Sequence, residues 1–245
     1  MNPFERFELS HLSASSLNCY MEEPAYWALV YLHKYRDEAG AAAWRGSAVE
    51  AGLDHWLFKR DLPAASQAAL IRFELDAMGE ADDKTEKERQ LITKMLEQAC
   101  LALQTYPEPT VRQFKIEHWF DGIEIPLIGF VDYEFGDRGI DLKTTRRMPT
   151  EMWPRHSRQL ALYAAARGKP YSALYVTDKR HDIKSVDSPA THVKRLEWSA
   201  HSIRRLLSVF PDKHDAARIF APNFESFYWN PMAIEAAKGI WDDCR

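Results

Sequence analysis

The chain has 245 residues, of which 46% are hydrophobic and 28% are charged. A chain of this length can bury one sizeable hydrophobic core, and we expect a single domain over residues 1–245. Its net charge of -4 argues against a protein that coats nucleic acid nonspecifically.

Membrane insertion, secretion and a disulfide framework are not expected from this sequence. The longest apolar run extends only from Tyr26 to Leu32, and the N-terminus MNPFERFELS lacks the pattern of a signal peptide. The three cysteines, Cys19, Cys100 and Cys244, lie far apart and form no C-x-x-C pair. Neither disulfides nor a cysteine-built metal cluster is indicated, so we expect a cytoplasmic protein.

The first part of the chain has the pattern of a helical region. Ser10, Ser13 or Ser15 can cap a first short helix, and Pro24 suits the first turn of a second. Further helices are expected at residues 41–60, 63–78 and 86–106. The charged run GEADDKTEKER predicts a solvated loop or a helix start.

The helix expected from residue 41 carries a glycine and an acid that need explanation. Gly46 costs a helix about 1 kcal/mol relative to alanine, which indicates close approach by another backbone or a ligand. Glu50 lies one turn further on, among small and apolar side chains, so its carboxylate needs a partner. A metal ion would serve, and a surface ion pair with Arg45 or Lys59 is the alternative.

After Pro107 the apolar residues recur with period two, which indicates strands. Strands are expected at residues 111–120, 123–135, 139–145, 171–178 and 191–199. A helix is expected over residues 152–167, another from Ser199 toward Phe220, and a short one after Pro231.

The order of these elements predicts the fold class. We expect an α/β fold with a mixed β-sheet flanked by helices. Residues 1–108 form its mainly helical part, and residues 109–245 form the α/β core with C-terminal helices.

Two aspartates and a lysine are expected to share one face of the sheet. Asp132 lies in one strand, and Asp141 and Lys143 lie two residues apart in the next. Because alternate residues of a strand point to the same face, Asp141 and Lys143 should point together toward Asp132. Carboxylate oxygens are preferred ligands of Mg²⁺ and Mn²⁺, and a lysine beside them can orient water or offset phosphate charge. The pattern fits metal-assisted phosphodiester hydrolysis; the alternative is a hairpin with ordinary solvated charges.

The segment that follows these residues is basic. Between Lys143 and Lys184 there are ten Lys and Arg residues against three acids, a balance of +7. Positive charge there can neutralise a polyanion, and a solvated helix face is the alternative. Within the helix expected in this segment, His156, Gln159 and Tyr163 recur at spacings of three and four, so they share one face.

Four stretches together resemble the PD-(D/E)XK nuclease superfamily, in the branch that includes RecB-type nuclease domains, CRISPR-associated exonucleases and phage exonucleases. LSASSLNCYMEEPAYWALVYL resembles the opening helices of that branch, and RGSAVE resembles the helix that carries its first metal-site residue. GFVDYEF followed by IDLKTT resembles the active-site hairpin, and RQLALY resembles the Q-x-x-x-Y motif of the next helix. The resemblance covers most of the chain and implies a restriction-endonuclease-like core.

The resemblance implies roles for individual residues. Asp132 is similar to the central metal-binding aspartate, Asp141 to the acid of the D/E-X-K triplet, and Lys143 to the catalytic lysine. Leu142 would offer its backbone carbonyl to a metal, and Glu50 stands where phage exonuclease-like members have glutamate and many RecB-type members have histidine. The implied site therefore holds Mg²⁺ or Mn²⁺.

The resemblance also implies contacts with DNA. Gln159 and Tyr163 match the helix motif that holds the active site and contacts DNA, and Arg45 would meet a terminal phosphate. Residues after the lysine would line the path of the strand: Thr144, Thr145, Arg146 and Arg147.

The expected activity is that of a metal-dependent DNA exonuclease acting in recombination, repair or phage DNA processing. The alternatives are a site-specific or structure-specific endonuclease and a noncatalytic DNA-binding module of the same fold. No iron–sulfur cluster is expected, because Glu23 stands where iron–sulfur members have a cysteine before Pro24, and only Cys244 lies near the C-terminus. The lack of a phosphate-loop motif predicts a stand-alone nuclease, for which a homo-oligomer or a recombination partner protein is suggested by analogy alone.

Overall fold

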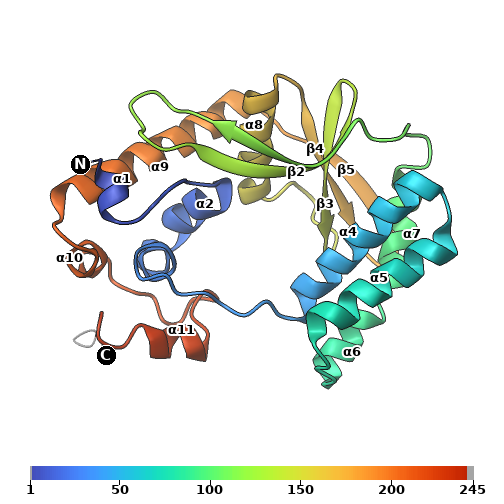
Figure 1. The fold of residues 1–245 in the computed structure, drawn as a ribbon, viewed down its shortest axis with the longest axis horizontal. Coiled ribbons are helices and arrows are strands. Elements are labelled where there is room, and N and C mark those ends of the chain that lie inside the picture. Colours follow the sequence, from blue (N-terminus) through green and yellow to red (C-terminus); the bar gives the residue numbers. More distant parts are fainter. Residues whose placement is uncertain (1, 242–245) are drawn as a thin grey trace.

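The structure is a computed structural model of the chain, and it describes residues 2–241. One mixed sheet has the strand order β1-β2-β3-β4-β5, in which the β3–β4 pair is parallel and the other pairs are antiparallel. The strands are β1 Val111–His118, β2 Leu127–Phe135, β3 Arg138–Thr144, β4 Tyr171–Val176 and β5 His181–Ser185. Figure 1 shows helices on both sides of this sheet. The predicted mixed α/β sheet flanked by helices is confirmed.

Helices precede the sheet, as predicted. They are α1 Pro3–Arg6, α2 Ala14–Glu22, α3 Pro24–Trp27, the π-helical turn η1 Ala28–Leu32, α4 Ala41–Lys59, α5 Leu62–Ala77, α6 Asp83–Arg89 and α7 Ile92–Ala102. Ser13 caps α2, because its side chain and that of Ser16 each accept a hydrogen bond from the other's backbone N–H group. The charged run after α5 contains α6, whose N-cap is Asp82.

Four helices follow β3. They are α8 Pro154–Arg167, α9 Pro189–Val209, α10 Lys213–Arg218 and α11 Pro231–Ala236. Pro154 stands in the first turn of α8, and Gly168 ends the helix in the left-handed conformation, with φ +67. The helices predicted at residues 152–167 and after Pro231 are therefore confirmed.

The strand predicted at residues 191–199 is wrong, because this segment lies within α9. Ser199, predicted to cap a helix, is inside α9, and its hydroxyl donates to the carbonyl of Arg195 at 2.9 Å. The apolar buried residues of α9 recur at the spacing of a helix: Leu196, Ala200, Ile203, Leu206 and Leu207. The fifth strand is instead β5, whose side chains are exposed or only partly buried.

The sheet separates two hydrophobic clusters. Tyr171, Ala173 and Tyr175 of β4 pack in the cluster that contains α2, α8 and α9. Leu174 and Val176 pack in the cluster that contains α4, α5 and α7. We refer to the two sides of the sheet as the α8 face and the α4 face.

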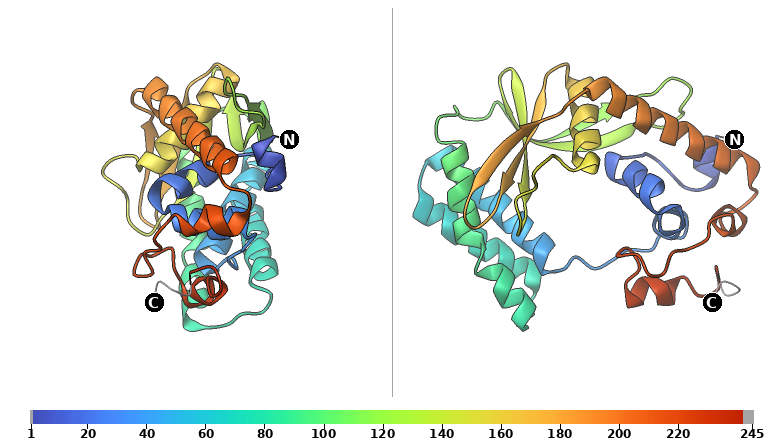
Figure 2. Two further views of the ribbon diagram at one scale, coloured as in Figure 1. Left: turned by 90° about the vertical axis from the view of Figure 1, so that its left-hand side faces the viewer. Right: turned by 180° about the vertical axis from the view of Figure 1, so that it is seen from behind.

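The helices form two groups on opposite sides of the sheet. In Figures 1 and 2, α1, α2, α10 and α11 lie on one side and α4 to α7 on the other, with residues 33–40 connecting η1 to α4. No helix within residues 2–241 is long and apolar enough to cross a membrane.

Candidate active site

The predicted acidic residues meet where β2 and β3 separate. β2 pairs with β3 only from Tyr133 to Phe135, and the start of β2 is bridged to Leu12 instead. Asp132 is the first residue beyond the paired part, and its Oδ2 accepts a hydrogen bond from the backbone N–H of Leu142 at 2.8 Å. The carboxylate thus takes the place of a strand carbonyl and is fixed beside β3. We call this place the β2–β3 fork.

Asp141 and Lys143 lie on the α8 face of β3, as the alternation of strand residues predicts. Their register partners in the parallel strand β4 are Ala173 and Tyr175, which face α8. Lys143 Nζ lies 2.6 Å from Asp141 Oδ2. Asp141 is 2% exposed, and this oxygen makes no hydrogen bond of ordinary geometry despite the ion pair. One oxygen of this buried carboxylate is therefore held by the ion pair alone.

Glu50 approaches the fork from α4. Its Oε1 accepts a hydrogen bond from Gln113 Nε2 at 3.0 Å, and its backbone carbonyl accepts one from the Tyr133 hydroxyl at 3.3 Å. Glu50 does not form the alternative ion pair with Arg45 or Lys59. Arg45 binds Glu88 instead, and Lys59 lies over the Phe58 ring.

Gln113 is a site residue that the sequence does not reveal. The pairs Arg112–Tyr133 and Phe114–Val131 place it opposite Asp132, and its φ of +45 is in the left-handed region. At this point the side chains of β1 and β2 switch from one face of the sheet to the other. Arg112 reaches Asp54 of α4 at 3.1 Å, whereas Val131 packs on the α8 face. This local reversal allows Gln113 to hold Glu50 while Asp132 faces β3.

The three carboxylates perturb one another. Burial raises the pKa of Asp132 well above its ordinary value, and the charges of Asp141 and Glu50 raise it further. The pKa of Glu50 is raised by burial and by Asp141, against the opposing hydrogen bond from Gln113. Burial alone would lower the pKa of Lys143, but the negative charge of Asp141 outweighs burial and raises this pKa. Excess negative charge at the fork thus favours a cation.

The donor set fits a hard metal ion, although the carboxylates are held apart by other partners. No group of three His, Cys, Asp or Glu side chains within residues 2–241 is arranged to hold a metal ion. Asp141 contacts Lys143, Asp132 binds the Leu142 N–H, and Glu50 binds Gln113. The oxygens are nevertheless the type that Mg²⁺ and Mn²⁺ prefer, and Asp141 Oδ2 lacks a hydrogen bond.

The two cysteines that the structure describes offer no alternative metal site. Cys19 and Cys100 are buried and free. Burial raises the pKa of each thiol to about 12, so neither supplies a thiolate at neutral pH. Cys244 lies outside the described residues.

The predicted face of α8 closes the site. Gln159 Nε2 donates to the Tyr163 hydroxyl at 2.7 Å. The Tyr163 ring fills the fork so closely that a Cβ on Gly129 would lie 2.5 Å from its Cε1 atom. His156 Nδ1 lies 2.6 Å from the Tyr175 hydroxyl, and burial, with the charge of Lys143, lowers the His156 pKa to about 3. His156 is therefore neutral and bound within this layer.

Arg45 is buried and faces the loop after β3. Its guanidinium binds the buried carboxylate of Glu88 and donates to Thr144 Oγ1 at 3.3 Å. Arg146 binds the same carboxylate, with Nη2 2.6 Å from Oε1. A Cβ on Gly46 would lie 3.4 Å from Thr144 Oγ1, an ordinary van der Waals distance, so the close approach expected at this glycine is not what the structure has. The pair Arg45–Glu88 thus fixes the start of the predicted DNA path.

The rest of that path is accessible. Thr145 Oγ1 donates to the carbonyl of Arg147 at 3.0 Å, and both Arg146 and Arg147 are exposed.

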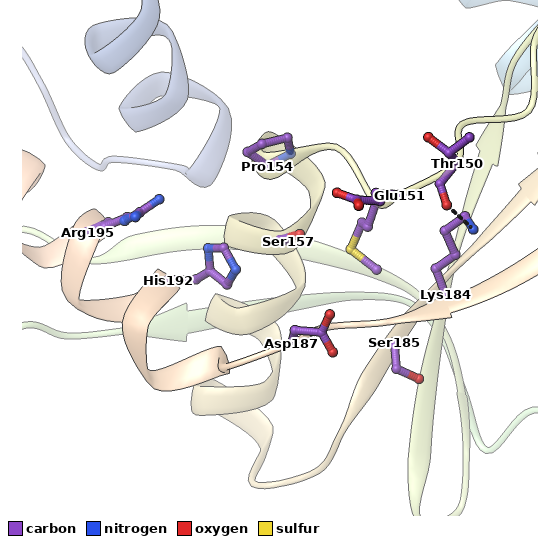
Figure 3. A pocket seen from close by; sticks show the side chains of 10 residues that line it. Thr150, Glu151, Pro154, Ser157, Lys184, Ser185, Asp187, His192 and Arg195 are labelled. Carbon is purple, nitrogen blue, oxygen red and sulfur yellow. Dashed lines mark hydrogen bonds between the residues drawn. The ribbon is translucent and has the colours of Figure 1, made fainter.

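Two polar cavities flank the N-terminal end of α8. One, of about 340 Å³, adjoins Lys143 and is lined also by Gln159 and Arg155. The other, of about 500 Å³, lies between the loop before α8, β5 and the start of α9 (Figure 3). Lys184 closes one side of it by donating to the Thr150 carbonyl at 3.0 Å. None of the predicted site residues lines this second cavity.

Comparison with known proteins identifies a family and a fold. The family model of the PD-(D/E)XK nuclease superfamily matches residues 11–226. Among solved structures, the chain is similar to a crystal structure from Eubacterium rectale named "Putative exonuclease", with a TM-score of 0.61 and 16% sequence identity. The match covers 90% of this chain and 87% of that chain, and at this identity it shows a shared fold. No curated protein matches the chain.

Proposed function

Because the chain belongs to the PD-(D/E)XK nuclease superfamily, we propose that it is a metal-dependent DNA nuclease that acts as an exonuclease. One observation carries the proposal. Asp132, Asp141 and Lys143 meet at the β2–β3 fork, and Glu50 approaches it from α4. A fold retained only for binding has no need of clustered carboxylates beside a phosphate.

The carboxylates would hold the metal. Asp132, Asp141 and Glu50 supply hard oxygen ligands for Mg²⁺ or Mn²⁺, and Leu142, between Asp141 and Lys143, would add its backbone carbonyl. When bound, such an ion stabilises charge on the phosphate and lowers the pKa of a coordinated water. Lys143 adds a positive charge beside the phosphate and orients the attacking water by donating to it.

The DNA strand would leave the fork along the loop after β3. Thr144, Thr145, Arg146 and Arg147 offer hydroxyl and guanidinium donors to phosphates. Arg45, which is 5% exposed, would act on this path through Thr144 and not by direct contact. Gln159 would hold the fork from α8 and contact the strand, whereas Tyr163, which is 3% exposed, would act through its hydrogen bond with Gln159.

Exonuclease action is the preferred form of this activity, on the resemblance to phage-type members that digest DNA ends. An endonuclease of the same fold is the second candidate. We place the protein in DNA recombination, repair or phage DNA processing on the same resemblance.

The test is cleavage of linear and covalently closed circular DNA with Mg²⁺ or Mn²⁺. We expect loss of linear DNA alone, and a decrease of at least about 100-fold for Lys143→Ala and Asp141→Asn. Lys115→Ala is the matched control, because Lys115 is exposed and pairs with Glu117 at 2.7 Å on β1. Cleavage of circular DNA would assign an endonuclease. Equal, metal-independent behaviour of all variants would leave a DNA-binding module.

A further inference from the structure

The cavity beside Lys143 has walls from three parts of the chain. Arg155 and Gln159 of α8 form one wall, Glu22 of α2 another, and Tyr228, between α10 and α11, a third. Its volume is about 340 Å³, and pockets from about 300 Å³ upward hold small ligands in proteins. One nucleotide unit therefore fits next to Lys143.

The charges around this cavity suit a phosphate group. Arg155 is exposed in the first turn of α8, where the helix N-terminus adds partial positive charge. Its guanidinium lies 4.9 Å from the Trp153 ring centroid, and no carboxylate within residues 2–241 forms an ion pair with it. The acid of the cavity, Glu22, is compensated by Arg158 at 2.9 Å and by the Tyr228 hydroxyl at 2.5 Å. A phosphate entering the cavity therefore meets an available cation and a neutralised acid.

Two stacked aromatic rings continue the third wall outward. The Phe227 and Tyr228 rings have centroids 4.2 Å apart and an interplanar angle of 30°. Phe227 is 80% exposed. The residues on either side are anchored, because the Ser226 hydroxyl donates to Glu23 at 3.2 Å and Trp229 is buried in the core. The exposed ring is thus held outward by a fixed segment.

We propose that this cavity and the Phe227 ring bind the unpaired end of a DNA strand, with a phosphate at Arg155 and a base stacked on Phe227. The proposal rests on the nuclease function proposed above and adds its substrate class, a single-stranded end. Aromatic side chains stack on unpaired bases whatever their identity, whereas bases inside a duplex have both faces covered. Phe227 lies just beyond the residues 11–226 that match the family.

The experiment measures stacking directly on the full-length protein in EDTA, which stops metal-dependent cleavage. The probe is a short single-stranded oligonucleotide with the fluorescent base 2-aminopurine at its end, compared with the same label in a blunt duplex. We expect fluorescence quenching on binding of the single strand, and weaker quenching with the duplex. Phe227→Ala should abolish the quenching and weaken single-strand binding about tenfold or more, and Phe227→Trp should restore both.

The matched control is Phe58→Ala, because Phe58 is an exposed aromatic on α4, away from the cavity. Equal effects of Phe227→Ala and Phe58→Ala, or equal quenching with the blunt duplex, would overturn the proposed subsite. If wild type still degrades linear DNA with metal in that case, the nuclease function stands alone. If wild type neither cleaves nor binds DNA, both proposals fall.

Discussion

Gln113 holds a backbone conformation that costs energy at the edge of the candidate site. A residue other than glycine in the left-handed region is disfavoured by about 1 kcal/mol or more. Gln113 has φ +45, and its side chain binds Glu50 at 3.0 Å. The cost coincides with the place where β1 and β2 change face opposite Asp132. We therefore interpret Gln113 as the residue that positions Glu50.

Replacing Gln113 by glycine should separate stability from activity. Gln113→Gly relieves the left-handed strain but adds backbone entropy to the unfolded chain, so the free energy of unfolding should change by less than about 1 kcal/mol. Cleavage should decrease, because Glu50 loses its hydrogen bond. Thermal melting and the linear-DNA assay measure the two effects.

Gln113→Asn is the control for side-chain length. Asparagine tolerates the left-handed backbone, but its side chain is one methylene shorter than that of glutamine. It should therefore not restore the hydrogen bond to Glu50. Full activity in both variants would show that Gln113 does not position Glu50.

Sequence pattern could predict some site residues and not others for a physical reason. Asp141 and Lys143 share a face because strand residues alternate, and this needs no knowledge of the rest of the chain. Gln113 breaks the alternation, and glutamine carries no preference for the left-handed region that would reveal it. The burial of Arg45 depends on Glu88, a partner more than forty residues away in α6, which local pattern does not contain.

At the scale of elements, strands and helices were predictable where burial is one-sided or complete. The positions of β3 and α8 agree with the expectation to within two residues, whereas β2 begins at Leu127, four residues after the predicted start. β5 is an edge strand with exposed or half-buried side chains, so it has no such signal. The start of α9 contains alternating Thr191 and Val193, and this local preference was overridden by packing of the later turns against α8.

The carboxylate of Glu134 connects β2 with α8 and β4 through hydrogen bonds. Arg167 at the end of α8 donates to it from Nε at 2.7 Å, Lys169 donates at 2.8 Å, and the Tyr171 hydroxyl of β4 also donates. The Arg167 hydrogen bond, then those of Lys169 and Tyr171, lower the Glu134 pKa from 4.5 to about 2, against burial. This arrangement fixes the end of β2 that lies beyond the fork.

The lowered pKa of Glu134 predicts how stability depends on pH. Because the folded pKa is below the ordinary value, the stabilisation is complete above about pH 4.5 and is lost as pH falls toward 2. Glu134→Gln should lower the free energy of unfolding by up to about 3 kcal/mol at pH 7, with a smaller difference at pH 3. Urea unfolding at several pH values measures this. A difference independent of pH would contradict the assigned role of the carboxylate.

In the molecule as a whole, the candidate site lies at the boundary between the two hydrophobic clusters. The sheet carries one hydrophobic cluster on each face, and the β2–β3 fork is where side chains from both faces approach, with Glu50 coming from α4 and Gln159 from α8. Carboxylates at this boundary are shielded from water by a hydrophobic cluster on each side. This explains why burial is the largest cause of the raised pKa values of Asp132 and Glu50.

The charge available to DNA is smaller than the sequence balance of +7 suggests. Several cations of the basic segment are engaged within the fold: Arg158 with Glu22, and Arg167 and Lys169 with Glu134. Arg146 is exposed but pairs with Glu88, and the exposed cations outside these pairs are Arg147, Arg155, Lys179 and Arg180. Such pairing depends on the tertiary structure. The net charge of a segment therefore predicts the sign of the surface charge and not its magnitude.

We propose that Asp132, Asp141 and Glu50 bind divalent metal, either one ion or two, at the β2–β3 fork. A crystal soaked in Mn²⁺ tests it most directly, because the anomalous signal of manganese locates the ion independently of any activity. We predict manganese at the β2–β3 fork, in contact with carboxylate oxygens of Asp132 and Asp141 and with Glu50 completing its ligands. Manganese bound elsewhere, with Asp141 still paired to Lys143 and Glu50 to Gln113 at a concentration that supports cleavage, would contradict the account.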